Sequence, residues 1–265
     1  MDMKARDELA IELGNIVSAA GKVIMAVRSS DVGARRKPDG SPVCDADTRA
    51  EQLIVARLAA LMPDVAVIAE ESFAPHHEAK VPERFFLVDP LDGTREFLVG
   101  HLDFTVNIAL IENGDPVAGA ICAPALDQAY LAGATAFRAQ LAAGGNLADA
   151  MKVVATSSVP AAGLRAVASR SHMNAATEQW LAQRPVAGLR RAGSSLKFCL
   201  IARGDADVYP RLATTMEWDT AAGHAILNAA GGCVIGLDGS PLRYGKSDAG
   251  FKNEGFVAWG RGPAR

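Results

Sequence analysis

The sequence predicts a mixed α/β protein in which helices and sheets are layered. In the first half, short apolar runs separated by turn residues predict strands that continue as an antiparallel sheet. In the second half, predicted strands and helices alternate, which is typical of a sheet whose faces are covered by helices. The chain has 265 residues, and we divide it at the loop over 142–150 into halves of 1–150 and 151–265.

The N-terminal region carries two predicted helices joined by a basic loop. Residues 4–27 place apolar side chains along one helical face, and the apolar pattern over 53–61 predicts a second helix. Three residues of N-cap type precede the second helix: Asp45, Asp47 and Thr48. The loop between the helices is either a solvated basic turn or a mobile lid near an anionic site, and its cations are Arg35, Arg36 and Lys37.

Predicted strands fill the rest of the first half. The pair Asn113-Gly114 lies between two of them and predicts a hairpin turn. The strands are expected at residues 65–69, 85–88, 104–111, 117–123, 129–132 and near 135–140.

In the second half, predicted strands and helices alternate along the chain. Strands are expected at 164–168, 187–192, 206–209, 232–237 and 256–259, and helices at 174–183, 195–203 and 218–230. Either Asp219 or Thr220 would cap the last helix.

Charge and composition exclude several classes of protein. The formal net charge is −3, whereas a nucleic-acid binder is usually basic, so we expect no nucleic-acid partner. We find neither an 18-residue apolar run nor a signal peptide, and expect no transmembrane segment. The four cysteines are far apart in the sequence, as expected of core thiols in a reducing compartment. The location predicted from these features is the cytoplasm.

Acidic residues follow two neighbouring predicted strands. The strand over 65–69 ends in Glu70, and the next strand runs into the motif D-P-L-D-G-T, which contains Asp89 and Asp92. If the two strands are neighbours, Glu70 and Asp89 emerge side by side. Carboxylate and carbonyl oxygens are the ligands that Mg²⁺ prefers. Gly93 and Thr94 come next and offer backbone N–H groups and a hydroxyl to a phosphate.

Two further acids lie at other predicted turns, Asp47 and Asp219. Several ionised carboxylates can converge only if cations neutralise them. No histidine or cysteine cluster shows ligand spacing, and His76-His77 is interpreted as a surface feature, so Mg²⁺ is favoured over Zn²⁺. Two-metal sites stabilise the attacking and the leaving oxygen in phosphoryl transfer. We therefore interpret the acids as ligands of a metal site for phosphoryl transfer.

The motifs E-E at 70–71, D-P-L-D-G-T at 89–94 and W-D-T-A-A-G at 218–223 resemble the signature blocks of the inositol monophosphatase superfamily. Within it, S-R-S-H, G-S-S-L-K-F-C and Y-P-R are similar to the CysQ-type 3′(2′),5′-bisphosphate nucleotidases. The resemblance implies an αβαβα sandwich, lithium sensitivity, and removal of the 3′-phosphate from 3′-phosphoadenosine 5′-phosphate to leave AMP. It also allows a peripheral position at the inner membrane.

The same resemblance implies a role for each acid. Glu70, Asp89 and the Leu91 carbonyl would hold a first Mg²⁺, and Asp89, Asp92 and Asp219 a second. Gly93 and Thr94 would hold the scissile phosphate. Asp47 would pair with Thr94 to help activate the attacking water, with a third, weaker metal as an option. Cys44 and Asp45 depart from the family pattern beside this site.

A bisphosphorylated nucleotide needs cations away from the metals. By resemblance, the second phosphate and the nucleoside would contact His172, Ser194, Lys197 and Arg211. Taken singly, Lys197 is equally explained as a snorkelling helix residue and Arg211 as a salt-bridge partner. Arg170 remains unassigned.

Three other functions fit parts of the pattern. An inositol monophosphatase or a fructose-1,6-bisphosphatase would share every metal ligand and differ only in the second-half motifs. A non-catalytic Mg²⁺ and nucleotide sensor would not need the pair Asp47 and Thr94. A dinucleotide-binding oxidoreductase is disfavoured because no G-x-G-x-x-G follows a predicted strand.

Overall fold

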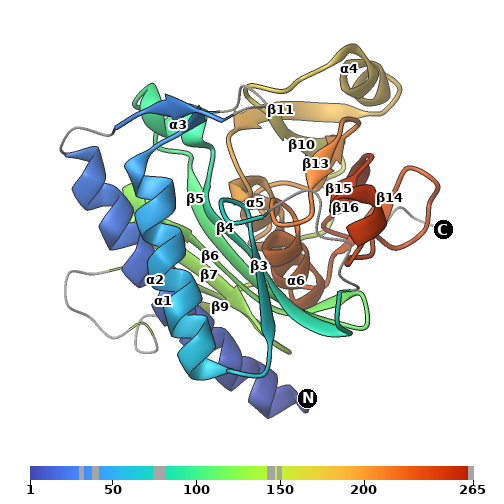
Figure 1. The fold of residues 1–265 in the computed structure, drawn as a ribbon. Helices are drawn as coiled ribbons and strands as arrows, with labels where there is room; N and C mark the ends of the chain where they lie inside the picture. Colours follow the sequence, from blue (N-terminus) through green and yellow to red (C-terminus); the bar gives the residue numbers. More distant parts are fainter. Residues whose placement is uncertain (30–32, 38–41, 74–80, 142–146, 148–150, 262–265) are drawn as a thin grey trace.

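A computed structural model describes residues 1–29, 33–37, 42–73, 81–141, 147 and 151–261 (Figure 1). The His76-His77 pair and nearly all of the predicted 142–150 loop lie outside these residues.

The larger of two main sheets has seven strands in chain order, β3 to β9. Strands β3 and β4 are parallel, and each later neighbour is antiparallel. Asn113 and Gly114 both have positive φ, 52° and 80°, in the β5–β6 turn, which confirms the predicted hairpin. The strands are β3 (Ala66–Ala69), β4 (Arg84–Asp92), β5 (Thr105–Glu112), β6 (Asp115–Ala123), β7 (Gln128–Ala132), β8 (Ala136–Gln140) and β9 (Met151–Val153).

Helices α1 (Met3–Arg28) and α2 (Asp45–Leu61) cover one face of this sheet (Figure 1). Their buried side chains, such as Leu13 and Ile54, share a core with Phe86 and Ile108 of the sheet. By length and composition α1 is apolar enough to cross a membrane, which the sequence analysis did not expect. Half of its most apolar window is nevertheless buried inside the fold, as in a core helix.

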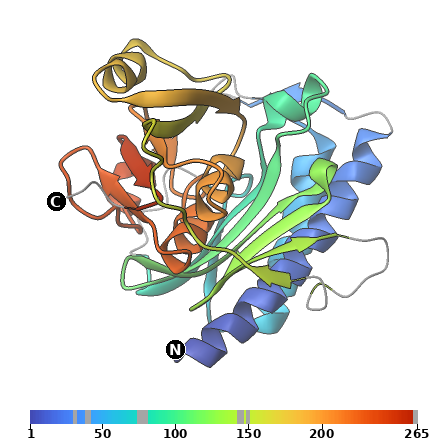
Figure 2. The same cartoon turned by 180° about the vertical axis from the view of Figure 1, so that it is seen from behind.

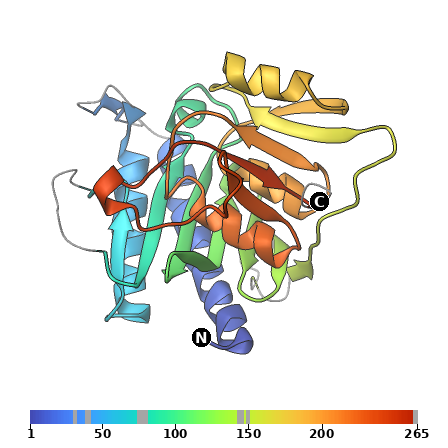
Figure 3. The same cartoon turned by 90° about the vertical axis from the view of Figure 1, so that its right-hand side faces the viewer.

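The opposite face of the seven-stranded sheet packs against α5 (Leu196–Ala202) and α6 (Ala221–Ala229) (Figure 2). These helices separate it from a five-stranded sheet of order β11-β10-β12-β16-β14. Helix α4 (Ala175–Ala182) lies on the outer side of that second sheet (Figure 3). The chain is therefore an αβαβα sandwich, as expected. The strands of the second sheet are β10 (Leu164–Ser169), β11 (Val186–Ala192), β12 (Val208–Arg211), β14 (Cys233–Gly236) and β16 (Phe256–Trp259).

Short elements lie beside the two sheets: α3 is at the upper end of the seven-stranded sheet in Figure 1, and β13 and β15 pair with each other close to β16. The short elements are β1 (Arg35–Arg36), β2 (Pro42–Val43), α3 (Thr94–Leu98), β13 (Thr215–Met216) and β15 (Lys252–Asn253).

Several predicted boundaries were wrong, for local reasons. The strand expected at 206–209 instead runs over Val208–Arg211. Pro210 does not end it, because proline lacks the backbone N–H but still pairs with Val257 of β16. The helix expected from residue 218 begins at Ala221, and Asp219 lies in the turn before it. Thr220 takes the N-cap position of that helix without a side-chain capping bond.

The N-cap of α2 also differs from the residues predicted for it. Cys44 takes that position, and Asp47 is the third helical residue, whose carboxylate accepts from the Cys44 backbone N–H at 2.8 Å. The described edge strand β9 was not predicted, because three residues are too few to show an alternating pattern.

Candidate active site

The acids after β3 and β4 lie side by side because these strands are parallel and in register. Ala69 pairs with Val88, so the next residues are Glu70 and Asp89. The Glu70 backbone N–H donates to the Val88 carbonyl at 3.1 Å and extends the pairing beyond the strand. The predicted juxtaposition of Glu70 and Asp89 is therefore present.

The chain leaves β4 through a bulge that turns several oxygen atoms toward one volume. Its pairing with β5 is irregular between Asp89 and Asp92, and Gly93 has a φ of 91°. Few residues other than glycine adopt that left-handed conformation. The Leu91 N–H donates to Asp89 Oδ1 at 3.0 Å, which holds the carboxylate while α3 begins at Thr94.

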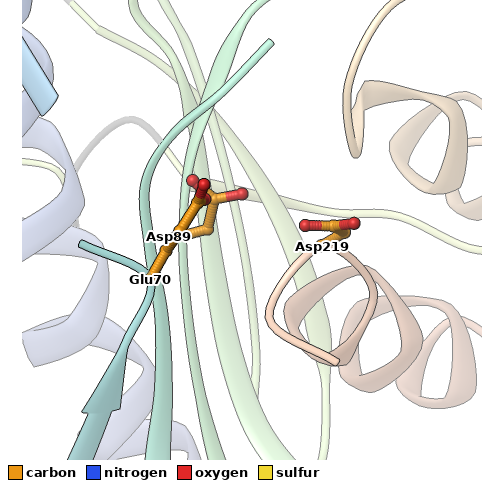
Figure 4. Close-up of side chains that lie close together, drawn as sticks. All are labelled: Glu70, Asp89 and Asp219. Carbon is orange, nitrogen blue, oxygen red and sulfur yellow. The ribbon is translucent and has the colours of Figure 1, made fainter. Parts of the chain in front are cut away.

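Asp219 approaches the other two acids from the opposite side, at the start of α6 (Figure 4). The Met216 N–H donates to Asp219 Oδ2 at 2.8 Å and fixes the turn. Carboxylate oxygens of Glu70, Asp89 and Asp219 all lie within 4.8 Å of one another. Asp92 lines the same cavity without belonging to this cluster of three.

Burial and mutual repulsion make this cluster unfavourable when ionised. Burial, then the charges of Glu70 and Asp92, raises the pKa of Asp89 well above its usual value. Burial and the charge of Asp92 do the same to the pKa of Asp219. Burial also raises the pKa of Asp92 to about 6, against the opposing influence of Lys197. An all-oxygen donor set that needs neutralisation fits a hard divalent cation such as Mg²⁺.

The loop cation Lys37 lies at the edge of the cluster. Its ammonium donates to Glu70 Oε1 at 2.8 Å and to Glu71 Oε1 at 2.7 Å. Burial raises the pKa of Glu71 to about 7, although Lys37 opposes the shift. Of the two interpretations of this loop, Lys37 supports proximity to the site, while Arg35 is exposed and pairs with Asp45.

Asp47 is buried behind Thr94. The Thr94 hydroxyl lies 3.0 Å from Asp47 Oδ1 and 3.1 Å from the Leu91 carbonyl oxygen. The other Asp47 oxygen accepts from the Cys44 N–H at 2.8 Å and from its thiol at 2.9 Å. The predicted pair of Asp47 and Thr94 is thus in contact, and Cys44 orients the carboxylate.

A cavity of about 380 Å³ joins this acidic end to side chains from the second half. It is lined by all the predicted metal and substrate residues except Asp47: Glu70, Asp89, Leu91, Asp92, Gly93, Thr94, His172, Ser194, Lys197, Arg211 and Asp219. The structure therefore gathers residues that are distant in the sequence around one space.

Two cations that line the cavity form no ion pair among the described residues. Lys197 is 4% exposed, its ammonium donates to the Ser194 carbonyl, and burial lowers its pKa to about 8. Arg211 reaches two carbonyls at 3.3 and 3.4 Å, and its buried Nε has no partner there. Buried charges are normally paired, so the buried Lys197, with the half-exposed Arg211 beside the same cavity, favours an anionic ligand.

Polar residues that no sequence motif singled out join the two halves. The Ser195 N–H donates to Asp92 Oδ2 at 2.6 Å. Arg170, left unassigned, donates to Asp103 at 2.9 Å. Serines and aspartates are common in loops, so only the three-dimensional structure distinguishes these.

A model of the inositol monophosphatase family matches residues 5–258, and the chain belongs to this family. The 3′(2′),5′-bisphosphate nucleotidase CysQ of Escherichia coli K12 is 39% identical over 246 residues, which are 89% of this chain and 94% of that protein. CysQ of Buchnera aphidicola is also 39% identical, over 92% of this chain and 90% of that protein.

Solved structures agree with this assignment. The crystal structure of CysQ from Bacteroides thetaiotaomicron has a TM-score of 0.82 and 35% identity, covering 97% of this chain and 98% of that one. An inositol monophosphatase from Anabaena has a TM-score of 0.74 at 24% identity, covering 96% and 91%, and shares the fold.

Substitution of Asp89 by asparagine should separate folding from metal binding. In the metal-free protein the melting temperature should not fall, because a neutral amide relieves repulsion within the cluster. With wild type, Mg²⁺ at roughly 100 times its Kd should add about 2.7 kcal/mol, a rise of several degrees. Asp89→Asn should abolish that rise.

Thermal unfolding with and without MgCl₂ measures both effects, and substitution of the exposed Asp64 by asparagine provides the control. An undiminished Mg²⁺-dependent rise in Asp89→Asn would contradict a metal site at this cluster.

Proposed function

We propose that the chain is a Mg²⁺-dependent 3′(2′),5′-bisphosphate nucleotidase that hydrolyses 3′-phosphoadenosine 5′-phosphate to AMP and phosphate. The observation that carries this proposal is that one cavity is lined both by the converging carboxylates and by two cations, Lys197 and Arg211, that form no ion pair among the described residues. The names of the similar CysQ proteins support the choice of substrate.

Two metals would be held by the acidic end. Glu70, Asp89 and the Leu91 carbonyl would bind one, and Asp89, Asp92 and Asp219 the other. Bound Mg²⁺ would lower the pKa of a water molecule and neutralise the charge on phosphate and acids. A third, weaker metal near Asp47 belongs to the same proposal. The raised pKa values of Asp89 and Asp219 support a site whose acids are ionised together when cations neutralise them.

Asp47 and Thr94 would act at the attacking water. Asp47 is 1% exposed and two of its hydrogen bonds come from Cys44, so its carboxylate is oriented before substrate arrives. The Thr94 hydroxyl would take a proton from the water while it passes its own proton to the Asp47 carboxylate, to which it already donates. Backbone N–H groups at Gly93 and Thr94 would orient the scissile phosphate. Water would attack phosphorus directly, without a covalent intermediate.

The second phosphate would bind in the same cavity at the two cations contributed by the second half. Lys197 and Arg211 would supply its charge, and His172 and Ser194 would contact the phosphate or the nucleoside. Burial and the charge of Arg211 lower the pKa of His172, which favours a neutral ring. A neutral imidazole suits a nucleoside contact, whereas the two cations suit a dianion.

An inositol monophosphatase remains the nearest alternative, because it uses the same acids. A substrate with one phosphate would leave Lys197 and Arg211 without an anionic partner, which favours the bisphosphate. The prediction of a cytoplasmic enzyme without a nucleic-acid partner stays part of this proposal.

A phosphate-release panel tests the proposal directly. It compares 3′-phosphoadenosine 5′-phosphate, 3′-phosphoadenosine 5′-phosphosulfate, inositol 1-phosphate and fructose 1,6-bisphosphate, each with Mg²⁺ and with EDTA. We expect kcat/KM for 3′-phosphoadenosine 5′-phosphate to exceed that for inositol 1-phosphate, which has no second phosphate, by at least about tenfold, since each charge-assisted contact contributes about 1.5–3 kcal/mol. EDTA should stop turnover. Preference for inositol 1-phosphate would overturn the proposal.

Two substitutions should separate specificity from catalysis. Lys197→Met should lower kcat/KM for 3′-phosphoadenosine 5′-phosphate roughly 10- to 100-fold, because one charged hydrogen bond of about 1.5–3 kcal/mol is lost. It should change 3′-AMP little, because that substrate has no second phosphate. Asp47→Asn should depress both substrates by a similar factor, because it acts at the water they share.

The four values of kcat/KM, set against wild type, form the measurement. An equal loss on both substrates in Lys197→Met would show that Lys197 does not bind the second phosphate.

A further inference from the structure

Asp103 joins the first half of the chain to the loop that precedes α5, the helix that carries Lys197. It lies between α3 and β5 and is 8% exposed. Its Oδ2 accepts from Arg170 Nη2 at 2.9 Å and Nε at 3.2 Å, and from the Gly193 N–H at 2.5 Å. Arg170 follows β10 and Gly193 follows β11, so one carboxylate ties together the ends of two parallel strands.

The approach of Gly193 to Asp103 leaves no room for a side chain. A Cβ at residue 193 would lie 2.4 Å from the Asp103 carbonyl oxygen and 3.0 Å from its Cγ. Backbone and carboxylate can therefore meet only because residue 193 is glycine.

Ser194 is held between two acid-bound backbone N–H groups. Gly193 before it binds Asp103, and Ser195 after it donates to Asp92 at 2.6 Å. Ser194 has a φ of 47°, a left-handed conformation that a non-glycine residue keeps only when its surroundings impose it. Its carbonyl oxygen accepts from the Lys197 ammonium. A continuous chain of contacts thus leads from Asp103 through Gly193 and Ser194 to Lys197.

Asp103 does not line the cavity. The groups that donate hydrogen bonds to its carboxylate stabilise the ionised form. Burial alone would raise the pKa of Asp103, but the hydrogen bonds from Arg170 and Gly193 hold it below its ordinary value. The Asp103 carboxylate therefore holds Arg170 and Gly193 without help from a metal.

We propose that Asp103, supported by Arg170, is a positioning residue that sets the preference for a substrate with a second phosphate by fixing Ser194 and thereby the Lys197 ammonium. The inference rests on the proposed function, because it assigns the second phosphate to Lys197. Asp103 acts through other residues and does not touch the substrate.

The metal end should be largely independent of Asp103. Ser195 keeps its contact with Asp92 through bonds of its own, since its hydroxyl lies 2.8 Å from Thr105 Oγ1 and 2.7 Å from Asn107 Oδ1. Loss of Asp103 should therefore loosen Gly193 and Ser194 more than Asp92.

The test compares 3′-phosphoadenosine 5′-phosphate with 3′-AMP in the Mg²⁺-loaded enzyme. Asp103→Ala should raise KM for the bisphosphate about tenfold with kcat within about threefold, and should leave kcat/KM for 3′-AMP within about threefold. Asp103→Asn keeps an oxygen for the Gly193 N–H and should lose less. Gly193→Ala, which displaces the same contact from the other side, should reproduce the loss of preference.

Asp207→Asn is the matched control. Asp207 is 1% exposed and binds Arg165 at 2.6 Å, so it is another buried acid–arginine pair, and neither residue lines the cavity. Its substitution should lower the melting temperature without changing the ratio of kcat/KM between the two substrates. If Asp103→Ala does not fold, the ratios in Asp103→Asn and Gly193→Ala decide the question.

The outcomes separate this inference from the proposed function. A wild-type enzyme without preference for the bisphosphate would contradict the proposed function. A wild-type preference that is unchanged in the folded Asp103 and Gly193 variants would overturn only the positioning role. Equal losses on both substrates would also overturn it, because they would show a general structural effect.

Discussion

The fold is constrained by carboxylates that repel one another and yet converge. Glu70 and Asp89 emerge together because β3 and β4 are parallel and in register, and Asp219 meets them from the start of α6. Burial of these groups costs free energy unless positive charge is close. In the described residues Lys37 supplies one such charge to Glu70 and Glu71. Cations held by the cluster would supply the rest.

Three other acids of the first half hold loops of the second half in place. Asp92 accepts from the Ser195 N–H, Glu96 from the Ser171 hydroxyl, and Asp103 from Gly193 and Arg170. All three acids lie between the end of β4 and the start of β5, so this one segment holds several loops of the second half. The cavity that results is lined by both acids and cations, and it suits a substrate with two phosphates.

The strand-end acids could be predicted because parallel neighbouring strands bring their last residues together, whatever the rest of the fold. The hairpin at Asn113-Gly114 was predictable for a similar reason, since both residues tolerate positive φ. The family resemblance located Asp47, Lys197 and Arg211, whose separate positions carry no signal of their own.

Other features could not be predicted because they depend on contacts between distant segments. Cys44 caps α2, although cysteine is not a preferred N-cap, because its thiol and N–H both reach Asp47. In the sequence Lys37 belongs to a basic loop, and only the structure shows that it pairs with Glu70 and Glu71. The role of Asp103 depends on how closely Gly193 approaches it.

We propose that the converging acids would hold two cations, with Asp89 contributing to both sites. Manganese accepts the same oxygen ligands as magnesium and is paramagnetic. Titration of the wild-type chain with Mn²⁺, followed by electron paramagnetic resonance, should show about two bound ions whose spectrum is exchange-coupled, as expected for ions about 3.5–4 Å apart. Saturation with a single, uncoupled Mn²⁺, or with none, would contradict the account.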